Sequence, residues 1–552
     1  MKGDFTRDTF QPAKHFCQVL MQQGRVTVDA DHNEQTAIDL HNLRATARDV
    51  IGPYAAPAGP DGGFVLAADA SGVFTIGKGR YYVDGILAEN DTDNCTYRSQ
   101  PDYPVPADDA LLAAMAGNAN AGASFSFWIY LDVWERHITA IEDDSIREKA
   151  LDGPDTCTRA KVTWQVKALP LTADLAQKLA VAERTVTTQI NNLWTQKAQL
   201  EKQFQAAAAT DTTTQINVLK QLQPVDDQLA RLTRLSLLPV HETLLSELVR
   251  ISNASLAARV DPGAKTEDVC VTPPDSKYRG AENQLYRVEI HRGGLAGEAT
   301  FKWSRDNGSV ATAWLGSQGS DLQVASARGF AAGNWVELTD DTAELLGKPG
   351  TLVQLVKVDG DTLSVDPASP LPPLSNFPTN SKVRRWDQVA TDAISLADDN
   401  AVPIQESPAG ATPEQIVWID LEDGVQVQFS AGGTYRTGDF WLIPARVTTG
   451  NVEWPQADDL NPQPLPPRGI EHHYALLGVI ARAAQAVGVE NLRCEFGPLF
   501  FCVTPSRLQP GANKWSKPES IVADTTTETR TDRAARKATV KPRSKRGSKR
   551  LQ

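Results

Sequence analysis

The chain has 552 residues, which is too long for one hydrophobic core and predicts roughly three or four domains. With 41% hydrophobic and 22% charged residues it has a soluble globular composition, and no run approaches the about 18 apolar residues of a membrane-spanning helix. The net charge of −13 is uneven, because residues 530–552 carry ten Lys or Arg and one Asp, which leaves −22 on the remainder. An acidic body repels nucleic acid, so a specific nucleic-acid-binding function is disfavoured.

The N-terminus and the cysteines bear on the compartment. Residues 1–8 contain no apolar segment of the kind that directs Sec export. The six cysteines form no CxxC pair, which disfavours a zinc ribbon and a disulfide-rich secreted module. We therefore expect free thiols, no signal peptide, and assembly in the cytoplasm.

Residues 1–53 predict an N-terminal docking segment made of an arm, a short strand and a helix. Arg25–Asp29 alternates polar and apolar residues, as a half-buried strand does. Asp31 and Glu34 have the spacing of a capping box at a helix start, and Gly52-Pro53 is expected to end the helix. Apolar residues recur between them at helical intervals: Ala37, Leu40, Leu43, Ala47, Val50 and Ile51. A Pro/Gly-rich linker follows at residues 54–63.

Residues 64–170 predict a β-domain, because apolar residues recur with period two. Val73–Ile76 is expected as one strand and Arg80–Leu87 as a longer strand after a glycine-bearing turn. The segment from Phe125 to Trp134 has apolar or aromatic side chains on both faces, so we expect both faces of that strand to be covered.

Residues 171–238 predict an inserted pair of helices, since they contain no glycine. Apolar residues repeat at intervals of seven in the first helix, and a second apolar helix follows the polar break at 206–214: Leu179, Val186, Leu193 and Leu200, then Ile216, Leu219, Leu222, Leu229 and Leu232. This pattern favours an antiparallel coiled-coil hairpin. Lys197 falls at a core-like position, and Pro224 is expected to kink or interrupt the second helix.

Strand patterns resume at Gln284 and predict β-domains over residues 239–400 and 401–510. Val353–Val358 and Thr362–Val365 flank an Asp-Gly turn, which predicts a hairpin. Residues 511–552 have too few large apolar residues to fold and predict a disordered basic tail. The tail lacks interleaved aromatic residues, so we expect at most salt-dependent contact with an acidic partner. The predicted fold class is mainly β and multi-domain, with sandwich-like or barrel-like modules and an inserted helical hairpin.

Two segments resemble metal sites in part. Asp29–Asn33 begins like a calcium loop, but Glu34 replaces the glycine and Leu40 the glutamate that such loops need. His472 and His473 are adjacent, and adjacent residues of a strand face opposite sides. We therefore expect no metal and no cofactor at either place.

One acidic stretch contains residue types suited to catalysis. Glu135, Glu142, Asp143 and Asp144 offer a carboxylate pair for glycoside hydrolysis. The same stretch contains Arg136, Arg147 and Arg159, and acids among arginines commonly form structural ion pairs. No Walker loop, GxSxG elbow or GxGxxG motif follows a predicted strand, so we predict no catalytic residues.

Tryptophans with an arginine close in sequence recur along the chain and are candidate structural or contact residues. Such pairs can stack by cation–π contact and anchor a strand to a neighbour. Two interpretations stay open: a contact to another subunit, or a clamp inside a domain core. The candidate residues are Trp134, Arg136, Trp303, Arg305, Trp386 (next to Arg384 and Arg385), Trp441 and Arg446.

Several segments together resemble a family of uncharacterised proteins encoded in gene clusters of extracellular contractile injection systems and phage-tail-like particles. They occur in order over most of residues 1–475: Met1–Phe10, Val19–Val26, Asp29–Gln35, Leu131–Ala140, Gly153–Thr156 with Arg159, Glu282–His291, Phe301–Ser309, Tyr435–Arg446 and Gly469–Tyr474. The resemblance implies a tail-associated structural protein at the baseplate, around the spike or in a fibre. It supplies no catalytic residues.

The sequence therefore leads to the hypothesis of a non-enzymatic assembly protein of a contractile injection particle. Its expected partners are other subunits of a tail-like particle, and further copies of itself if it forms a trimer or larger homo-oligomer. Two alternatives stay open, a carbohydrate-active or cell-wall-degrading tail enzyme and a receptor-binding fibre.

Overall fold

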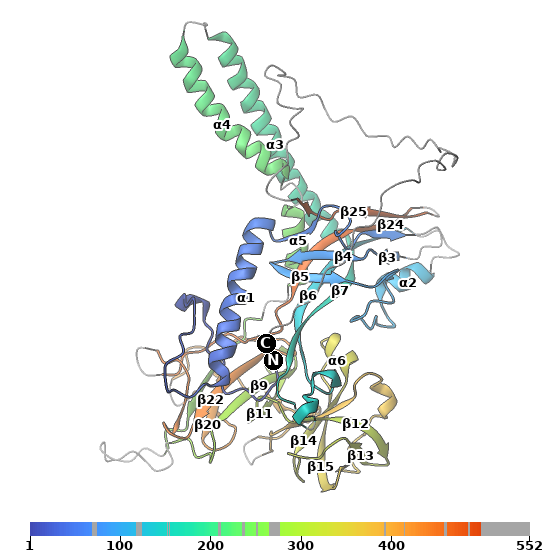
Figure 1. The fold of residues 1–552 in the computed structure, drawn as a ribbon, viewed down its shortest axis with the longest axis vertical. Helices are drawn as coiled ribbons and strands as arrows, with labels where there is room; N and C mark the ends of the chain where they lie inside the picture. Colours follow the sequence, from blue (N-terminus) through green and yellow to red (C-terminus); the bar gives the residue numbers. More distant parts are fainter. Residues whose placement is uncertain are drawn as a thin grey trace, which may run out of the picture. The chain divides into compact units, whose positions relative to one another are not determined.

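The period-two segments form strands and the glycine-free segment forms helices in the computed structural model (Figure 1). The structure describes residues 1–68, 74–117, 124–151, 153, 155–207, 211–234, 238–249, 252–263, 277–390, 394–412, 415–457, 461–483 and 486–497. These residues all belong to one unit, Met1–Gly497. The fold is mainly β and includes one closed barrel, as the sequence predicted. The predicted basic tail lies outside the described residues.

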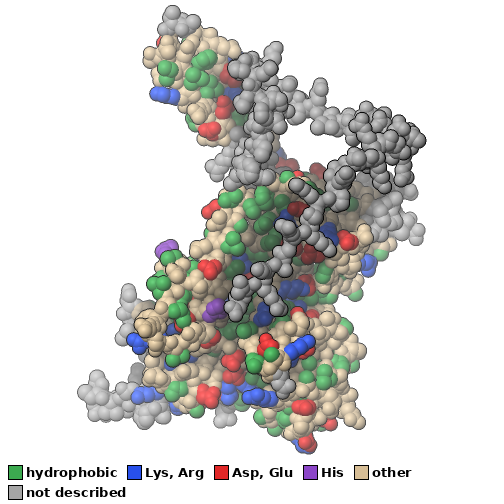
Figure 2. All heavy atoms as spheres, viewed as in Figure 1, with side chains coloured by type: hydrophobic (Ala, Val, Ile, Leu, Met, Phe, Trp, Pro, Cys, Tyr) green, Lys and Arg blue, Asp and Glu red, His purple; other side chains and the backbone are tan. Residues whose placement is uncertain are grey.

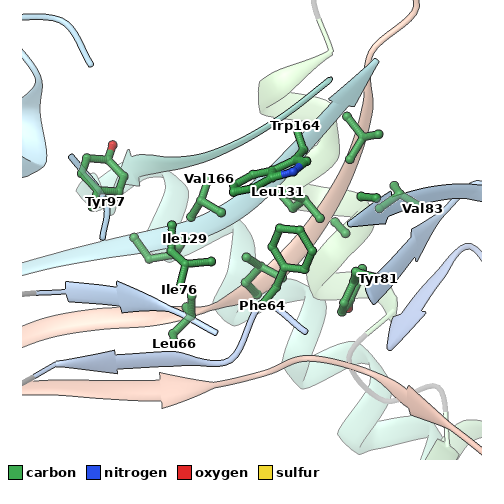
Figure 3. Packing of buried hydrophobic residues seen from close by; sticks show 14 of the residues in the cluster. Phe64, Leu66, Ile76, Tyr81, Val83, Tyr97, Ile129, Leu131, Trp164 and Val166 are labelled. Atoms are coloured by element: carbon green, nitrogen blue, oxygen red, sulfur yellow. The ribbon is translucent and has the colours of Figure 1, made fainter. Parts of the chain in front are cut away.

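The first group of sheets joins the two ends of the unit. One sheet has the order β26 (Glu495–Phe496), β1 (Tyr54–Pro57), β4 (Gly79–Val83), β5 (Ile86–Asn90), and another has the order β25 (Ala486–Asn491), β24 (His473–Ala483), β6 (Phe125–Ile138), β7 (Arg159–Pro170). A ribbon of β2 (Leu66–Ala68) and β3 (Phe74–Ile76) and the helix α2 (Ala110–Gly117) complete the group. Figure 3 shows the core between the sheets, where the Phe64 ring meets Trp164 edge to face at 5.0 Å.

The second group of sheets has its own core. Five strands follow the order β18 (Val402–Pro403), β11 (Thr300–Ser304), β9 (Gln284–Arg292), β22 (Phe440–Arg446), β23 (Asn451–Val452). Three more follow the order β19 (Ile419–Asp420), β20 (Val425–Phe429), β8 (Leu256–Val260), and β10 (Gly294–Leu295) pairs with β21 (Thr434–Tyr435). Phe429 lies at the centre of this core, with its ring 5.2 Å from Phe301 and 5.9 Å from Trp441.

The third group is a closed six-stranded barrel. Its strands follow the order β12 (Ala311–Gln318), β13 (Asp321–Val324), β16 (Thr362–Val365), β15 (Thr351–Asp359), β14 (Trp335–Thr339), β17 (Lys382–Trp386), and the short helix α6 (Asp341–Leu345) follows β14. β15 and β16 form the predicted hairpin, and Gly360 in its turn has a φ of 56°, which glycine adopts without strain. The prediction of this hairpin is confirmed.

The remaining long helices lie outside the sheets. They are α1 (Asp29–Ile51), α3 (Ala173–Ala206), α4 (Thr212–Arg234) and α5 (Leu238–Leu248), with short 3₁₀ turns at Pro12–Lys14, Asp144–Ile146, Lys149–Leu151 and Leu374–Asn376. α3 and α4 run antiparallel and bury Leu200, Val218 and Leu229 between them. Lys197 Nζ reaches Asp226 at 2.7 Å, so its charge lies beside the seam. α4 continues through Pro224, so the predicted interruption is wrong.

Three local predictions near the N-terminus are wrong. Arg25–Val28 forms no strand and is exposed, and α1 begins at Asp29 with Val28 at the N-cap position, without a side-chain cap. Glu34 accepts a hydrogen bond from the Thr9 hydroxyl at 2.6 Å, so it does not act in a capping box. The expected strand Arg80–Leu87 is the hairpin β4–β5, because Asp84 and Gly85 both adopt positive φ. The helix end at Gly52 is confirmed.

The strands of the sequence segment 401–510 divide between two groups. β18 to β23 lie in the second group of sheets, whereas β24, β25 and β26 pair with β6 and β1 of the first. β24 lies beside β6 over the register from His473↔Val133 to Arg482↔Phe125. Strands more than 300 residues apart in the sequence therefore pair within one unit. The local sequence pattern does not reveal this pairing.

Candidate functional site

A cavity of about 390 Å³ lies where β6, β9, β14 and β17 approach one another. Residues from the N-terminal segment, α1 and the loop after α6 also line it. Its lining is unusually rich in charge: the basic side chains are Lys2, Arg44, Arg136, Arg287, Lys302, Lys348 and Arg384, and the acidic ones are Glu135, Glu142, Glu289, Glu337, Glu344 and Glu471. Concave sites with converging polar groups are where ligands commonly bind.

Successive side chains of a strand point to opposite faces, and this alternation places the charged side chains on the face that lines the cavity. β9 directs Val288 and Ile290 into the second core, so Arg287 and Glu289 point to the opposite face. β17 does the same with Val383, which lies in the barrel core, while Lys382 and Arg384 take the other face. The strands thus bury a polar face as well as an apolar one, and the buried polar faces meet at the cavity.

Lys382 is the centre of the first charge cluster. Its ammonium lies 3.3 Å from Asp341, 3.1 Å from Glu344 and within hydrogen-bond distance of Glu142. Arg136 from β6 adds contacts of 2.5 Å to Asp341 and 3.0 Å to Glu344. The three carboxylates are spaced closely enough to ligate a metal ion, but the ammonium already lies among them.

A second cluster surrounds Lys302 on β11. The Lys302 ammonium lies 2.5 Å from Glu337 and 3.4 Å from Glu289, and 4.5 Å from the centre of the Trp386 ring. Glu337 also accepts hydrogen bonds from Trp386 Nε1 at 2.8 Å and from the Gly350 amide at 2.9 Å. Every oxygen of this buried carboxylate is therefore satisfied, as burial requires.

The N-terminal segment is bound into the same region. Glu289 forms an ion pair with Lys2 at 3.0 Å. It also accepts a hydrogen bond from Arg287 Nε at 2.6 Å. Asn307 Nδ2 donates to the carbonyl oxygens of Met1 at 3.2 Å and Gly3 at 2.9 Å. These contacts hold the first three residues of the chain against the second charge cluster.

The charges shift the pKa values of their neighbours. Burial alone raises the pKa of Glu344, but Lys382 and Arg384 outweigh it and lower the value to about 2. Glu337 and Glu289 likewise keep pKa values well below the usual range because lysines and arginines outweigh desolvation. Burial, with Lys302 nearby, lowers the pKa of His291 to about 4. At neutral pH the carboxylates are ionised and this histidine is neutral.

The candidate tryptophans lie inside the chain. Trp134, Trp303, Trp386 and Trp441 are at most 3% exposed. The cations over the Trp386 ring are Lys2 and Lys302 and not the neighbouring arginines. Lys167 lies over the Trp134 ring at 5.5 Å. Rings this deeply buried contribute to this chain's own cores and not to its surface.

The candidate arginines make ion pairs at different places. Arg136 joins the Lys382 cluster, as described above. Arg305 donates to Glu422 at 2.6 Å, and burial raises the pKa of Glu422 to about 7 despite this contact. Arg446 donates to Glu453 at 3.1 Å and to the Thr6 carbonyl at 3.0 Å. Only the first of these arginines lines the cavity.

The acids weighed for glycoside hydrolysis lie mostly in ion pairs. Glu135 pairs with Arg44 at 2.7 Å, Glu142 with Lys382, and Asp144 with Arg147 at 2.8 Å. Asp143 caps the following 3₁₀ turn by accepting from the Ser145 amide. Although burial alone would raise it, Lys382 lowers the pKa of Glu142, whereas a general acid needs a raised pKa.

In the two segments that resemble metal sites in part, the candidate side chains form hydrogen bonds with other residues of the chain. Asp29 accepts from the Thr6 amide at 2.9 Å, and the whole of Asp29–Asn33 is helical. His472 Nδ1 lies 2.7 Å from Asp132, while His473 Nδ1 lies 3.0 Å from Asp84. The two imidazoles therefore have different carboxylate partners.

A second candidate site is an exposed apolar surface at the N-terminus. We define the N-terminal loop as residues 16–28, which connect the anchored first residues to α1. Its side chains Phe16, Leu20, Met21 and Val26 are between 57% and 86% exposed. α1 continues the surface, since the predicted apolar stripe at Leu40, Leu43 and Val50 is exposed, and only Ala30 and Ile38 are buried.

The chain is attached to the fold before, within and after the loop. Before it, Asp8 pairs with Arg468, and Thr9 donates to Glu34. Within it, the Val19 amide donates to Gln35 at 2.7 Å, and after it the Asp29 carboxylate accepts from the Thr6 amide at 2.9 Å. Apolar side chains are thus presented to solvent on a segment with defined attachments, a combination typical of interaction surfaces.

The helix pair also carries apolar side chains on its surface, as Figure 2 shows at its upper end. Trp194 on α3 and Ile216 and Leu219 on α4 are about half exposed, and Lys197 lies over the Trp194 ring. The cysteines Cys17, Cys95, Cys157 and Cys494 are free. Among the described helices, none is both long and apolar enough to span a bilayer.

Sequence reasoning missed the main charge clusters. The contacts that join β6 and its following turn to Lys382, Asp341 and Glu344 come from Glu142 and Arg136, which are more than 190 residues away in the sequence. A signal existed: Arg287-Val-Glu-Ile-His291 and Lys382-Val-Arg384 alternate charge with apolar residues inside strands flanked by other strands. Charged residues at alternate positions of a central strand indicate a buried polar face.

Comparisons with known proteins add a family but no activity. The model of a family described as "Family of unknown function (DUF6519)" matches residues 1–550, so the chain belongs to that family. No curated protein and no solved structure matches the chain.

Proposed function

We propose that this member of the DUF6519 family is a structural component of a contractile injection system, and that it holds neighbouring subunits by contact without catalysing a reaction. The segments that resemble proteins of contractile injection gene clusters, and their order along the chain, support membership of a tail-like particle. The observation that carries the proposal is the N-terminal loop, because it displays large apolar side chains while the chain is attached to the fold before, within and after it.

The exposed loop has a physical consequence. Each large apolar side chain left in water forfeits about 1.5–3 kcal/mol of burial free energy. Phe16, Leu20, Met21 and Val26 lie within one short segment, and Leu43 and Val50 extend the surface along α1. A neighbouring subunit that covers this surface recovers that free energy, and the anchored backbone has little conformational entropy left to lose on binding.

The helix pair fits the same role. We propose that α3 and α4 form a coiled-coil hairpin that reaches an adjacent subunit through Trp194, Ile216 and Leu219. Aromatic residues beside a cation are common anchors in interfaces. If the chain is instead a receptor-binding fibre, these residues pack around a three-fold axis.

The enzymatic alternative receives less support from the site. A retaining or inverting glycosidase needs one carboxylic acid that stays protonated near neutral pH. The cavity carboxylates Glu142, Glu337 and Glu344 have lowered pKa values and direct lysine partners. They are suited to holding strands together.

The test uses particles from cells that express the chain's own gene cluster. Tail-like particles are purified by sedimentation and examined by mass spectrometry and electron microscopy, with wild type compared with Leu20→Asp/Met21→Asp. We expect wild-type protein in the particle and loss of the double variant from it. Gln22→Asp/Gln23→Asp adds the same charge to the same loop without removing apolar surface and is expected to assemble normally.

Two results would contradict the proposal. One is a failure in the particle assay, either wild-type protein that never sediments with a particle or Leu20→Asp/Met21→Asp protein that is incorporated as well as wild type. The other is turnover of a cell-wall glycan or peptide by the purified protein that a single Glu142→Gln change abolishes.

A further inference from the structure

The cavity contains one buried cation that makes no direct ion pair with the surrounding acids. Arg384 is 4% exposed, and its Nη1 donates to the Gly308 carbonyl oxygen. Its Nε is buried without a hydrogen-bond partner. Among the described residues, no carboxylate lies within ion-pair distance of this guanidinium. A buried guanidinium without an anionic partner is costly.

The charge balance around the cavity identifies the same residue. The buried basic groups of the two clusters are Lys2, Arg136, Arg287, Lys302, Lys382 and Arg384, and the buried acidic groups are Glu142, Glu289, Glu337, Asp341 and Glu344. Five of the six cations contact at least one of the acids directly. Arg384 is the sixth, and it makes no ion pair with any of them.

A second donor is available beside it. His137 lines the same cavity, and its Nε2 is buried without a hydrogen-bond partner. Arg384 is close enough to be among the groups that lower the pKa of this histidine, after burial. A neutral imidazole whose Nε2 carries the proton donates one hydrogen bond, which complements the charged donors of a guanidinium.

The size and the chemistry together define a ligand class. A volume of about 390 Å³ falls within the range of roughly 300–1,000 Å³ found for small-molecule sites. Planar guanidinium groups bind carboxylate and phosphate oxygens through paired N–H donors. A ligand with such a group would give Arg384 a direct anionic partner and accept hydrogen bonds from Arg384 Nε and His137 Nε2.

We infer that the cavity is a binding site for a small oxyanion, a carboxylate or a phosphoryl group of a small molecule, which Arg384 and His137 hold. The inference is independent of the proposed assembly role, since a bound anion would fix the three groups of sheets together whatever the particle is.

The experiment measures thermal unfolding of the purified full chain in sodium phosphate, sodium acetate and sodium chloride at equal ionic strength. Phosphate and acetate separate the two sources of the oxyanion, and chloride controls for screening. We expect phosphate or acetate to raise Tm above its value in chloride, by an amount that grows with anion concentration.

Variants decide whether the effect belongs to the cavity. Arg384→Met keeps the side-chain length, removes the unpaired charge and is expected to abolish the anion-dependent shift while its Tm in chloride stays equal to wild type or rises. Arg385→Met removes the same charge from the next position of β17, whose side chain pairs with Asp306 and Asp387 and does not line the cavity. This control is expected to lower Tm in chloride and to keep the anion-dependent shift.

Two outcomes overturn the inference. If neither phosphate nor acetate stabilises the wild-type chain beyond chloride, the cavity is not an oxyanion site. If Arg384→Met retains the full shift, or if it lowers Tm in chloride as far as Arg385→Met does, Arg384 is a structural residue and the anion binds elsewhere.

Discussion

The interior cavity buries charged side chains, whereas the N-terminal loop exposes apolar ones. Around the cavity, charged side chains are buried, and nearly all of them meet an opposite charge of the same chain. In the loop, the side chains of Phe16, Leu20, Met21 and Val26 are 57% to 86% exposed. The first arrangement is satisfied mostly within one chain, whereas the second leaves apolar surface in water. The contrast supports the view that the cavity region stabilises the fold, and it is the basis of the proposal that the loop serves association.

The largest expected effect comes from breaking the completed region. Lys382 is fully buried among three carboxylates, so Lys382→Met leaves Glu142, Asp341 and Glu344 without their shared cation, and Arg136 contacts only Asp341 and Glu344. Removing one partner of a buried ion pair costs about 3–5 kcal/mol. We expect the urea midpoint, followed by tryptophan fluorescence, to fall accordingly.

The matched control is Lys357→Met, because Lys357 pairs with Asp359 on the solvent side of β15. Exposed ion pairs contribute little to stability, so its urea curve should overlay that of wild type. Equal curves for the two variants would contradict the view that buried pairing holds the sheets together.

The second prediction concerns pH. His291 is 3% exposed, and its folded pKa is about 4 because of burial and Lys302. In the unfolded chain a histidine protonates near pH 6.5, so between pH 6.5 and 4 the unfolded state binds more protons. The free energy of unfolding should therefore fall as the pH drops through this window, by up to about 3 kcal/mol from this group.

Urea titrations at a series of pH values measure this slope. His291→Gln should reduce it between pH 6.5 and 4 by the contribution of His291 alone, because His137, whose pKa burial also lowers to about 4, remains. His32→Gln on the exposed side of α1 serves as the control. The carboxylates with lowered pKa values act in a different range, since the stability that they contribute is present above pH 4.5 and is lost only as the pH falls toward 2. An unchanged slope in His291→Gln would show that another group controls this window.

The third prediction separates the helix pair from the sheets. Leu200, Val218 and Leu229 form a cluster apart from the three β cores. Leu200→Ala removes buried volume from the seam and should lower the local stability of α3 and α4 by about 2–3 kcal/mol. Far-UV circular dichroism should then lose helical signal at a lower temperature, while the near-UV signal of the sheets keeps its transition.

Leu219→Ala on the exposed side of α4 is the control for this change, since Leu219 is about half exposed. It should leave both transitions in place. A single transition that shifts as a whole in Leu200→Ala would mean that the helix pair and the sheets unfold as one unit.

The sequence predicted local structure well where one pattern decided it. The strand from Phe125 to Trp134, the Asp-Gly hairpin after Val358 and the helix end at Gly52 all follow from short-range rules. The strand at Arg25–Asp29 failed because alternation alone does not form a strand without a neighbour to pair with. The predicted apolar stripe of α1 exists, but it faces solvent.

The candidate site was less accessible to prediction. Its decisive contacts join Glu142 to Lys382 and Arg136 to Asp341, over separations of more than 200 residues. Ion pairs have no periodicity, so nothing in the sequence indicates which acid meets which base. The alternating charges of β9 and β17 did indicate buried polar faces, and that signal is the part that sequence reasoning can recover.

The smallest expected effect on stability belongs to the N-terminal loop. This prediction tests most directly whether the loop, unlike the cavity region, is dispensable for folding. Leu20→Asp/Met21→Asp changes two side chains that are 74% and 61% exposed, so the free energy of unfolding should stay within about 0.5 kcal/mol of wild type. The same variant is expected to be lost from the particle. A residue pair that matters for assembly and not for folding is what an association surface requires, because selection for folding alone would replace exposed Leu and Met with polar residues. If the double variant destabilises the isolated chain as strongly as Lys382→Met does, the loop packs against the chain in solution and the distinction between the two regions fails.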